Sequence, residues 1–300
     1  MNTWKDYVEL KAAPSLHRPH LLAAWSGMGA VAILAFNYLR QALAARELGQ
    51  IDARRFFSPN QVNIQDRLIQ EPEFAENKFY YWQGGAAHDL LFFIGNQQPP
   101  QAYEMAHLIL DTADHFGVER IYTAAAFPTF MHHHQPPGVW GAANEKALLR
   151  ELEHYGVQIM DRGTIGGLNG LLLGVARERV RPGLCLLGEI PLYTTQTINP
   201  RAAQAVLGVL GRMLAIQIDT AKLDLWAADM DPQMEQLYQL LPDHARQALE
   251  ETGPETTPPP PPLDEGPELV ADDAFFDQIE RFLQQGWQDQ EDDDSESQFS

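Results

Sequence analysis

The residues whose spacing best suits chemistry are glycines near the middle of the chain. Five of them surround the start of an apolar helical pattern: Gly163, Gly166, Gly167, Gly170 and Gly174. Glycine destabilises a helix by roughly 0.5–1 kcal/mol relative to alanine, so such a cluster needs a physical reason. Either a ligand approaches backbone N–H groups at the helix N-terminus, or a neighbouring element lies too close for a Cβ atom. The ligand-binding candidates here are Gly166, Gly167, Asn169 and Gly170, although the leucines that follow indicate burial and favour close packing.

Two other turns contain ligand-binding candidates because each follows a predicted strand. Gly27 and Gly29 stand between an apolar strand and a helical pattern, as in a phosphate-binding turn. The third glycine of a dinucleotide site and a Gly-Lys-Ser/Thr ending are both missing, which favours a tight packing turn. Asn96 follows the apolar run 89–94. If these strands are parallel, their turns meet at one edge of the sheet, where ligands of such folds bind.

Glu189 follows a further apolar strand and is the carboxylate best placed for acid–base chemistry. It could act with Asp161, which stands on the other side of the glycine cluster. Alternatively, Glu189 accepts hydrogen bonds from backbone N–H groups or pairs with Arg162 or Arg181. No nucleophile with a clear partner accompanies it, so the second interpretation is favoured and no catalytic residue is assigned.

Three consecutive histidines, His132, His133 and His134, raise the question of a metal, with His154 further along the chain. Neighbouring side chains in a strand point to opposite faces, so one ion rarely binds all three. The flanking Phe-Pro-Thr and Pro-Pro-Gly segments are typical of a loop. The sequence therefore favours a polar surface or subunit-contact loop, and we expect no metal and no other cofactor.

Composition excludes several classes of protein. A net charge of −20 argues against binding to nucleic acid, which needs a basic face. The single cysteine, Cys185, rules out an intramolecular disulfide and stands among leucines as a small core residue would. No apolar run approaches the ~20 residues needed to cross a bilayer, and residues 1–11 lack the apolar core of a secretion signal. We expect a cytoplasmic protein that does not bind membranes.

The negative charge is concentrated at the C-terminal end. Residues 264–300 hold thirteen acidic residues and one basic residue, a charge of −12 that leaves −8 for the rest of the chain. The five prolines 258–262 favour an extended rod. We therefore expect an α/β domain over residues 3–249, a proline-rich linker over 250–270 and an acidic tail over 271–300.

The tail itself contains one predicted amphipathic helix, over residues 271–286. Its apolar stripe and the aromatic residue after it are candidates for partner binding: Phe275, Phe276, Ile279, Phe282, Leu283 and Trp287. Two interpretations stand side by side. The helix docks on its own body or on a neighbouring subunit, or it binds in a groove of another protein.

The body alternates between strands and helices. Continuous apolar strands at 21–25, 89–94, 121–126 and 183–187, separated by helical patterns, predict a mostly parallel sheet with helices on both faces. After the turn at Gly27 and Gly29 we expect a long helix to about Leu48, then a strand over 51–57 and short extended segments over 59–72. Further along, we expect a helix over 144–155 capped by Asn144, and a helix or helix pair over 219–241 interrupted near Pro232.

Four blocks of sequence, spread over about residues 19–223, resemble the PAC2 family of proteasome assembly chaperone 2-like proteins. They read HLLAAWSGMGAVAILAFNYL, FFIGNQQPP, FGVERIYTAAAFPT and VWGAANEKALLRELEHYGVQIMDRGTIGGLNGLLLGVARERVRPGLCLLGEIPLY. The resemblance implies an α/β core similar to that of nucleoside phosphorylases and peptidyl hydrolases. It also implies homo-oligomers, often trimers, and a role as a binding or assembly factor, with no catalytic residues to carry over.

The C-terminal residues of this chain differ from the C-terminal pattern of some archaeal relatives. Archaeal relatives that bind proteasome rings resemble one another in ending with a hydrophobic residue, a tyrosine and any residue. This chain ends Gln298-Phe299-Ser300, so proteasome docking through the C-terminus is not expected.

Two functions follow from these observations. The favoured one is an oligomeric assembly or chaperone-like factor that binds a protein partner of unknown identity and performs no catalysis. The alternative is an enzyme with a small-molecule or phosphate site at the strand C-terminal edge, of phosphorylase, hydrolase or ATP-dependent ligase type. An enzyme should gather Ser26, Asn96, Glu189 and the glycine turn around one polar pocket. An assembly factor should show that edge filled by apolar side chains or by a neighbouring subunit.

Overall fold

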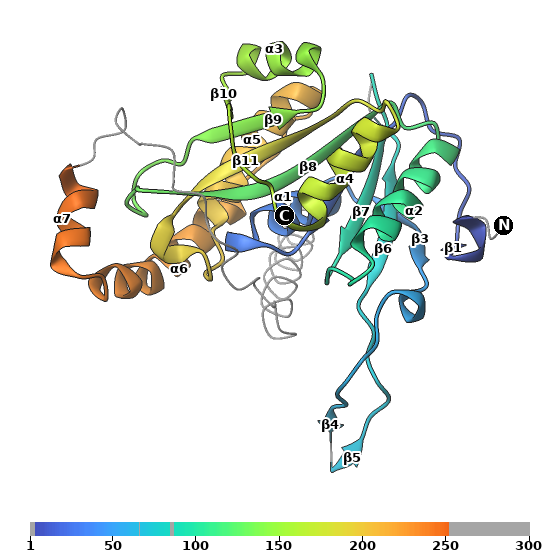
Figure 1. Ribbon diagram of the computed structural model, residues 1–300, viewed down its shortest axis with the longest axis horizontal. Helices are drawn as coiled ribbons and strands as arrows, with labels where there is room; N and C mark the ends of the chain where they lie inside the picture. Colours follow the sequence, from blue (N-terminus) through green and yellow to red (C-terminus); the bar gives the residue numbers. More distant parts are fainter. Residues whose placement is uncertain (1–3, 66, 85–86, 252–300) are drawn as a thin grey trace, which may run out of the picture.

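A computed structural model of the chain describes residues 4–65, 67–84 and 87–251, built around one large mixed sheet (Figure 1). The order of its nine described strands is β1-β3-β6-β7-β2-β8-β11-β9-β10. Their bounds are β1 Val8–Leu10, β2 His20–Trp25, β3 Arg46–Ile51, β6 Asn77–Trp82, β7 Leu90–Gly95, β8 Arg120–Thr129, β9 Val139–Ala143, β10 Gln158–Ile159 and β11 Gly183–Pro191.

The centre of the sheet is parallel and its flanks are mixed. Strands β7, β2, β8 and β11 run in the same direction, with β2 between β7 and β8. All residues of β2 and β7 are buried, as expected for strands covered on both faces. On one flank β6, β3 and β1 pair antiparallel, and on the other β9 is antiparallel to β11. The prediction of a mostly parallel sheet with helices on both faces is confirmed.

Helices cover both faces of the sheet and form two separate cores. Their bounds are α1 Val31–Ala42, α2 Ala102–His115, α3 Lys146–His154, α4 Gly167–Glu178, α5 Pro200–Leu214, α6 Ala221–Gln239 and α7 Asp243–Glu251. Helices α1 and α5 pack together on one face, and α2 and α4 on the other. The strands serve both cores by alternation: Leu22 faces the α1 side, whereas Leu21 and Ala23 face the α2 side.

Two expected elements near residue 48 are wrong. The first long helix ends at Ala42 instead of Leu48, and the strand that follows, β3, ends at Ile51 instead of beginning there. Ala44 adopts a positive φ of 48°, which ends the helix. Pairing of β3 with β6 and β1 overrides the helix propensity of residues 46–48. The region 51–57, predicted as a strand, contains the short 3-10 helix η3, Ala53–Arg55.

Two further details differ from the sequence prediction. Asn144 does not cap α3, whose N-cap residue is Glu145. The Asn144 side chain instead accepts a hydrogen bond from Gly183 N at 2.9 Å and donates one to Arg181 O at 2.8 Å. Helix α6 runs through Pro232 without interruption.

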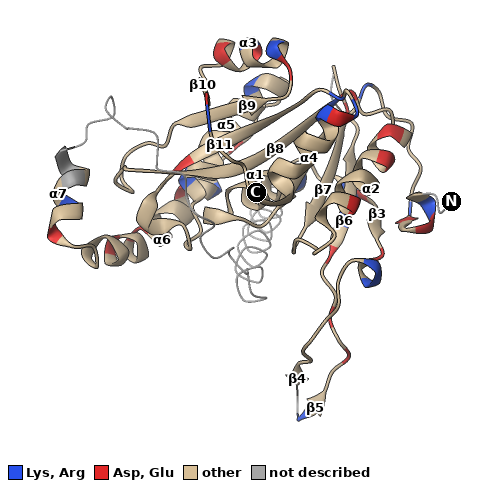
Figure 2. Ribbon diagram, viewed as in Figure 1, with Lys and Arg blue, Asp and Glu red and all other residues tan. Residues whose placement is uncertain are grey.

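A hairpin arm projects from the body between β3 and β6 (Figure 1). We use this name for residues 58–65 and 67–76, which include the paired strands β4 (Ile64–Gln65) and β5 (Leu68–Ile69). Short extended segments were the expectation for this region, and the strands are short indeed. Figure 2 shows a basic residue, Arg67, in the turn between β4 and β5, with the acidic residues of the arm nearer the body.

The first two residues of the predicted linker, 250 and 251, belong to helix α7. The rest of the linker and the predicted tail, including Phe275, Phe276, Ile279, Phe282, Leu283 and Trp287, lie outside the described residues. The domain boundaries at 249 and 270 therefore stay predictions. Of the helices that the structure describes, none is both long and apolar enough to cross a membrane.

Candidate functional site

The three turns that the sequence singles out come together at the C-terminal edge of the central strands. Ser26 Oγ donates a hydrogen bond to Asn96 O at 2.9 Å, which joins the turn after β2 to the turn after β7. Gln98 then links both to α4: its Nε2 donates to Ser26 O at 3.4 Å, and its Oε1 accepts from Leu168 N at 2.6 Å. The chain thus supplies its own acceptor for an N–H group at the start of α4.

Asn169 closes the same edge from the first turn of α4. Strands β2 and β8 are paired only as far as Ala23, so the backbone of Trp25 has no partner on that side. Asn169 Oδ1 accepts from Trp25 N at 3.2 Å, and Asn169 Nδ2 donates to Trp25 O at 3.4 Å. The buried amide therefore replaces a neighbouring strand, a structural reason for its presence.

The glycines of α4 fall into two groups. A Cβ atom at Gly167, which has a positive φ of 62°, would collide with the Gln98 side chain, and one at Gly170 would collide with the Ile165 carbonyl oxygen. Gly166 and Gly174 are exposed, and a Cβ atom at either would meet nothing within 4 Å. Close approach thus explains Gly167 and Gly170, whereas Gly166 faces open space.

The glycines after β2 belong to a packed turn. Gly29 has a positive φ of 64°, and a Cβ atom there would lie 3.3 Å from Ile190. Its N–H donates to Thr195 O at 3.0 Å, and its carbonyl accepts from Asn199 N at 2.8 Å, just before α5. At Gly27, the nearest atom to an added Cβ would be Asn169 Nδ2 at 3.8 Å. The Gly29 amide that could have held an anion is bonded to the protein itself.

Glu189 faces β9 and not the three turns. Its two oxygens accept hydrogen bonds from Gly138 N and from Trp140 Nε1, each at 2.8 Å. Arg181, a possible partner, pairs with Asp114 at 2.8 Å. The carboxylate holds the start of β9 against the end of β11. This edge thus brings Ser26, Asn96 and the glycine turn together and leaves Glu189 bonded elsewhere.

Gln98 is a residue of this edge that the sequence reasoning did not single out. Its signal was present in the block FFIGNQQPP, where the glutamines follow a buried strand just as Asn96 does. Cys185 is fully buried, and burial raises its pKa to about 12, so it is no nucleophile.

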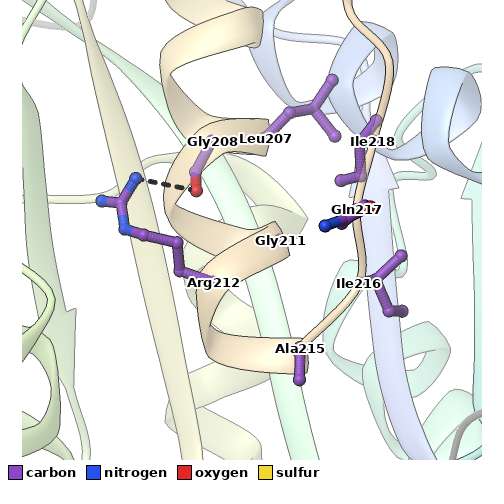
Figure 3. Close-up of a pocket in the computed structure, with 8 residues that line it drawn as sticks. All are labelled: Leu207, Gly208, Gly211, Arg212, Ala215, Ile216, Gln217 and Ile218. Carbon is purple, nitrogen blue, oxygen red and sulfur yellow. Dashed lines mark hydrogen bonds between the residues drawn. The ribbon is translucent and has the colours of Figure 1, made fainter.

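A hollow of about 380 Å³ lies at the C-terminal end of α5, the opposite end from the Gly29 turn (Figure 3). The charged residue in its lining, Arg212, donates hydrogen bonds to Gly208 O at 3.0 Å and to Tyr155 O at 3.1 Å. A Cβ atom at Gly211 would lie 2.9 Å from Ile216 O, so glycine lets the chain fold back on the helix. The lining residues include no acidic group: Leu207, Gly208, Gly211, Arg212, Ala215, Ile216, Gln217 and Ile218.

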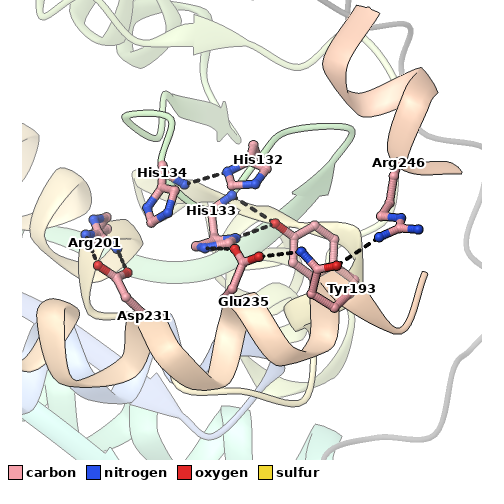
Figure 4. A network of polar contacts seen from close by, with 9 residues as sticks. His132, His133, His134, Tyr193, Arg201, Asp231, Glu235 and Arg246 are labelled. Carbon is pink, nitrogen blue, oxygen red and sulfur yellow. Dashed lines mark hydrogen bonds and ion pairs between the residues drawn. The ribbon is translucent and has the colours of Figure 1, made fainter. Parts of the chain in front are cut away.

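The three consecutive histidines lie in a turn beyond the end of β8 (Figure 4). They therefore do not alternate between faces as they would in a strand. One nitrogen from each of His132, His133 and His134 lies within 4.8 Å of the others. The ring centroids of His132 and His134 lie 4.2 Å from that of His133.

His133 is the buried member of this group. Its Nδ1 lies 2.8 Å from the Tyr193 hydroxyl, which also accepts from His133 N at 2.9 Å. Burial, followed by the charges of His132 and His134, lowers the pKa of His133 to about 4. Its imidazole is therefore neutral at pH 7, the state in which it can bind a metal.

A second group of three possible ligands forms where β2 and β8 begin. One atom from each of His20, His88 and Glu119 lies within 4.8 Å of the others. Burial, then the charges of His88 and Arg120, lowers the pKa of His20 to about 3. Glu119 forms an ion pair with Arg18 at 3.1 Å.

Comparisons with known proteins agree with the fold. The model of the PAC2 family matches residues 21–238. An uncharacterized protein of Methanocaldococcus jannaschii is 28% identical over 233 residues, which are 76% of this chain and 86% of that protein. Among solved structures, Pyrococcus furiosus PbaB, described as an archaeal proteasome activator, is 27% identical with a TM-score of 0.66, over 77% of this chain and 97% of PbaB. Pyrococcus furiosus PbaA, described as an archaeal homolog of proteasome-assembly chaperone, shares the fold at 24% identity and a TM-score of 0.61, over 81% of this chain and 96% of PbaA.

Proposed function

Because the chain belongs to the PAC2 family, we propose that it is an oligomeric factor that binds other proteins and assists their assembly. The descriptions of PbaB as a proteasome activator and of PbaA as an assembly-chaperone homolog support a role in protein assemblies. We propose further that the protein forms a homo-oligomer, with three subunits as the family resemblance implies, and acts in the cytoplasm.

The hairpin arm is the observation that carries this proposal. Four large apolar side chains gather on the arm with much of their surface exposed to solvent. The exposed fractions are 46% for Val62, 73% for Ile64, 66% for Leu68 and 74% for Ile69. Burying one such side chain contributes about 1.5–3 kcal/mol, so a partner that covers the tip gains substantial free energy. Clustered apolar groups of this kind mark protein contact sites.

The polar edge supports a binding protein over an enzyme. Ser26, Gln98 and Asn169 form hydrogen bonds with the protein's own backbone, and Glu189 is bonded to Gly138 and Trp140. A substrate at this edge would have to break those bonds before any group there could act on it. Catalysis is therefore not part of the proposal.

The test compares two charged double variants of the full chain. Ile64→Asp with Ile69→Asp places carboxylates at the tip of the arm. Val180→Asp with Leu225→Asp is the matched control, because these residues are 84% and 69% exposed on the body. We expect the arm variant to keep its circular dichroism and melting temperature while losing subunits in analytical ultracentrifugation or losing proteins that the wild type captures. If the arm variant keeps both, or the control loses them equally, the proposal is wrong.

A further inference from the structure

We propose that His132, His133 and His134, with Glu235 of α6, form a binding site for one Zn²⁺ ion. The four side chains come from two segments about 100 residues apart, the turn after β8 and the C-terminal part of α6 (Figure 4). The site lies apart from the polar edge and from the arm, and it stands independently of the proposed function.

The buried nitrogen of His133 is the first observation. Its side chain is fully buried, and Nε2 has no hydrogen-bond partner. A buried polar atom without a partner is destabilising, so such an atom in a folded protein requires an explanation. A bound cation would give this nitrogen its partner.

The distance to Glu235 fits the same ion. Glu235 Oε2 lies 3.5 Å from His133 Nε2, too far for a good hydrogen bond. Around a tetrahedral zinc ion with ligands at about 2.0–2.1 Å, neighbouring ligand atoms lie about 3.3 Å apart. These two atoms already have nearly that separation, and the other oxygen of Glu235, Oε1, accepts a hydrogen bond from Gln239 Nε2 at 2.6 Å.

The second nitrogen of His133 is also arranged as in a metal-bound histidine. Metal-binding imidazoles usually hold their other ring nitrogen in a hydrogen bond that fixes the orientation of the ring. Here Tyr193 does so, with its hydroxyl 2.8 Å from Nδ1.

The turn explains how consecutive histidines can share one ion. His134 N donates a hydrogen bond to His132 Nδ1 at 3.2 Å, which bends the chain and brings both rings to the side of His133. One nitrogen of each histidine lies within 4.8 Å of the other two, and the exposed His134 side chain is free of the core that fixes His133.

Charge separates this group from the second histidine group. Glu235 faces His133, and Asp231 adds further negative charge while paired with Arg201. Around His20 and His88, by contrast, the cations Arg18 and Arg120 act on the site, and Glu119 is already paired with Arg18. The surroundings of the first group therefore favour a divalent cation more than those of the second.

The ligand set identifies the kind of site. Imidazole and carboxylate ligands suit zinc, and four protein ligands complete its tetrahedral coordination. A complete set leaves no open position for a substrate. The ion would thus be structural and would fasten the turn after β8 to α6.

The experiment titrates full-length, tag-free protein, stripped with a chelator, with Zn²⁺ in a calorimeter. We expect one ion per chain in the wild type, and a Co²⁺-loaded sample should show the intense visible absorption of tetrahedral cobalt. His134→Ala removes an exposed ligand and should weaken binding at least 100-fold. Tyr193→Phe should weaken it by about 10- to 100-fold through loss of the orienting bond.

The matched control is His88→Ala, which removes a histidine of the second group and should leave zinc binding unchanged. Glu235→Gln tests the carboxylate separately and should lower affinity while the protein stays folded, because this side chain is 45% exposed. The proposal is overturned if the wild type takes up no stoichiometric zinc. It is equally overturned if His134→Ala binds like the wild type or if His88→Ala removes binding.

Discussion

At the scale of single residues, buried His20 links the stability of the protein to pH. Its imidazole stacks on that of His88, with ring centroids 3.9 Å apart. Burial, followed by His88 and Arg120, lowers its pKa from 6.5 to about 3, and only Glu119 acts in the opposite direction. The folded protein therefore keeps this residue neutral at pH values where the unfolded chain protonates it.

This difference predicts how stability changes with pH. Between pH 6.5 and about 3 the unfolded state binds one more proton at His20 than the folded state does, so the free energy of unfolding falls as pH falls. The contribution is at most about 1.4 kcal/mol per pH unit. In His20→Gln, denaturant unfolding measured between pH 7 and pH 4 should show a flatter dependence. His154→Gln, at an exposed position, is the control, and parallel curves for His20→Gln and the wild type would contradict the prediction.

Some residues could be placed from the sequence and others only from the structure. Cys185 stands in an apolar run, so its burial follows from its neighbours. The partners of Glu189 and Asn144 could not be identified in this way, because Gly138 and Gly183 lie 51 and 39 residues away. The sequence around a polar residue can predict that a strand or helix ends there. It does not predict which distant backbone groups the side chain will bond.

At the scale of elements, the glycines of α4 should differ in how an alanine at each position changes stability. Gly170→Ala should destabilise the protein by about 1–3 kcal/mol, because the new methyl group collides with the Ile165 carbonyl oxygen and the backbone must move. Gly174→Ala should stabilise it by roughly 0.5–1 kcal/mol, because the position is exposed and open. Urea denaturation of both variants measures the two effects. Equal effects would mean that helix propensity alone governs this helix.

Local patterns predicted the central elements better than the flanking ones. The boundaries of α5 follow directly from its sequence, since Pro200 begins the helix and Asn199 caps it through Ala202 N. Segment 43–48 has the composition of a helix, yet its residues 46–48 begin β3 because two strands distant in sequence pair with that strand. The loop that holds the histidines could be predicted from its flanking prolines and glycine, and β8 indeed ends at Thr129. The contact of His133 with Tyr193 could not, because the two residues lie 60 positions apart.

At the scale of the whole molecule, the sheet separates two cores that both lie within the described residues. We therefore expect a chain that lacks residues 254–300 to fold and to form the same oligomer, while losing contact with a partner. Thermal unfolding and light scattering check the first expectation, and affinity capture with and without the tail checks the second. Loss of the oligomer on truncation would show that the tail takes part in subunit contacts.

The fold class follows from the order of elements, because buried apolar strands that alternate with helices have few other arrangements. The strand order does not follow so simply. Strand β9 enters the sheet beyond β11, antiparallel to it, and β3 and β6 extend the opposite flank. These placements depend on pairing between distant segments, which no local pattern encodes.

The hairpin arm also affects how this protein can diverge from its relatives. It leaves the body after β3 and returns at β6, and these two strands are paired neighbours in the sheet. The two points of attachment therefore stay fixed whatever the arm's length or sequence, since long surface insertions have little effect on stability. Mutations at the tip can accumulate without disturbing either core. If the tip is the contact site proposed above, natural selection can exchange one partner for another while the scaffold is inherited unchanged.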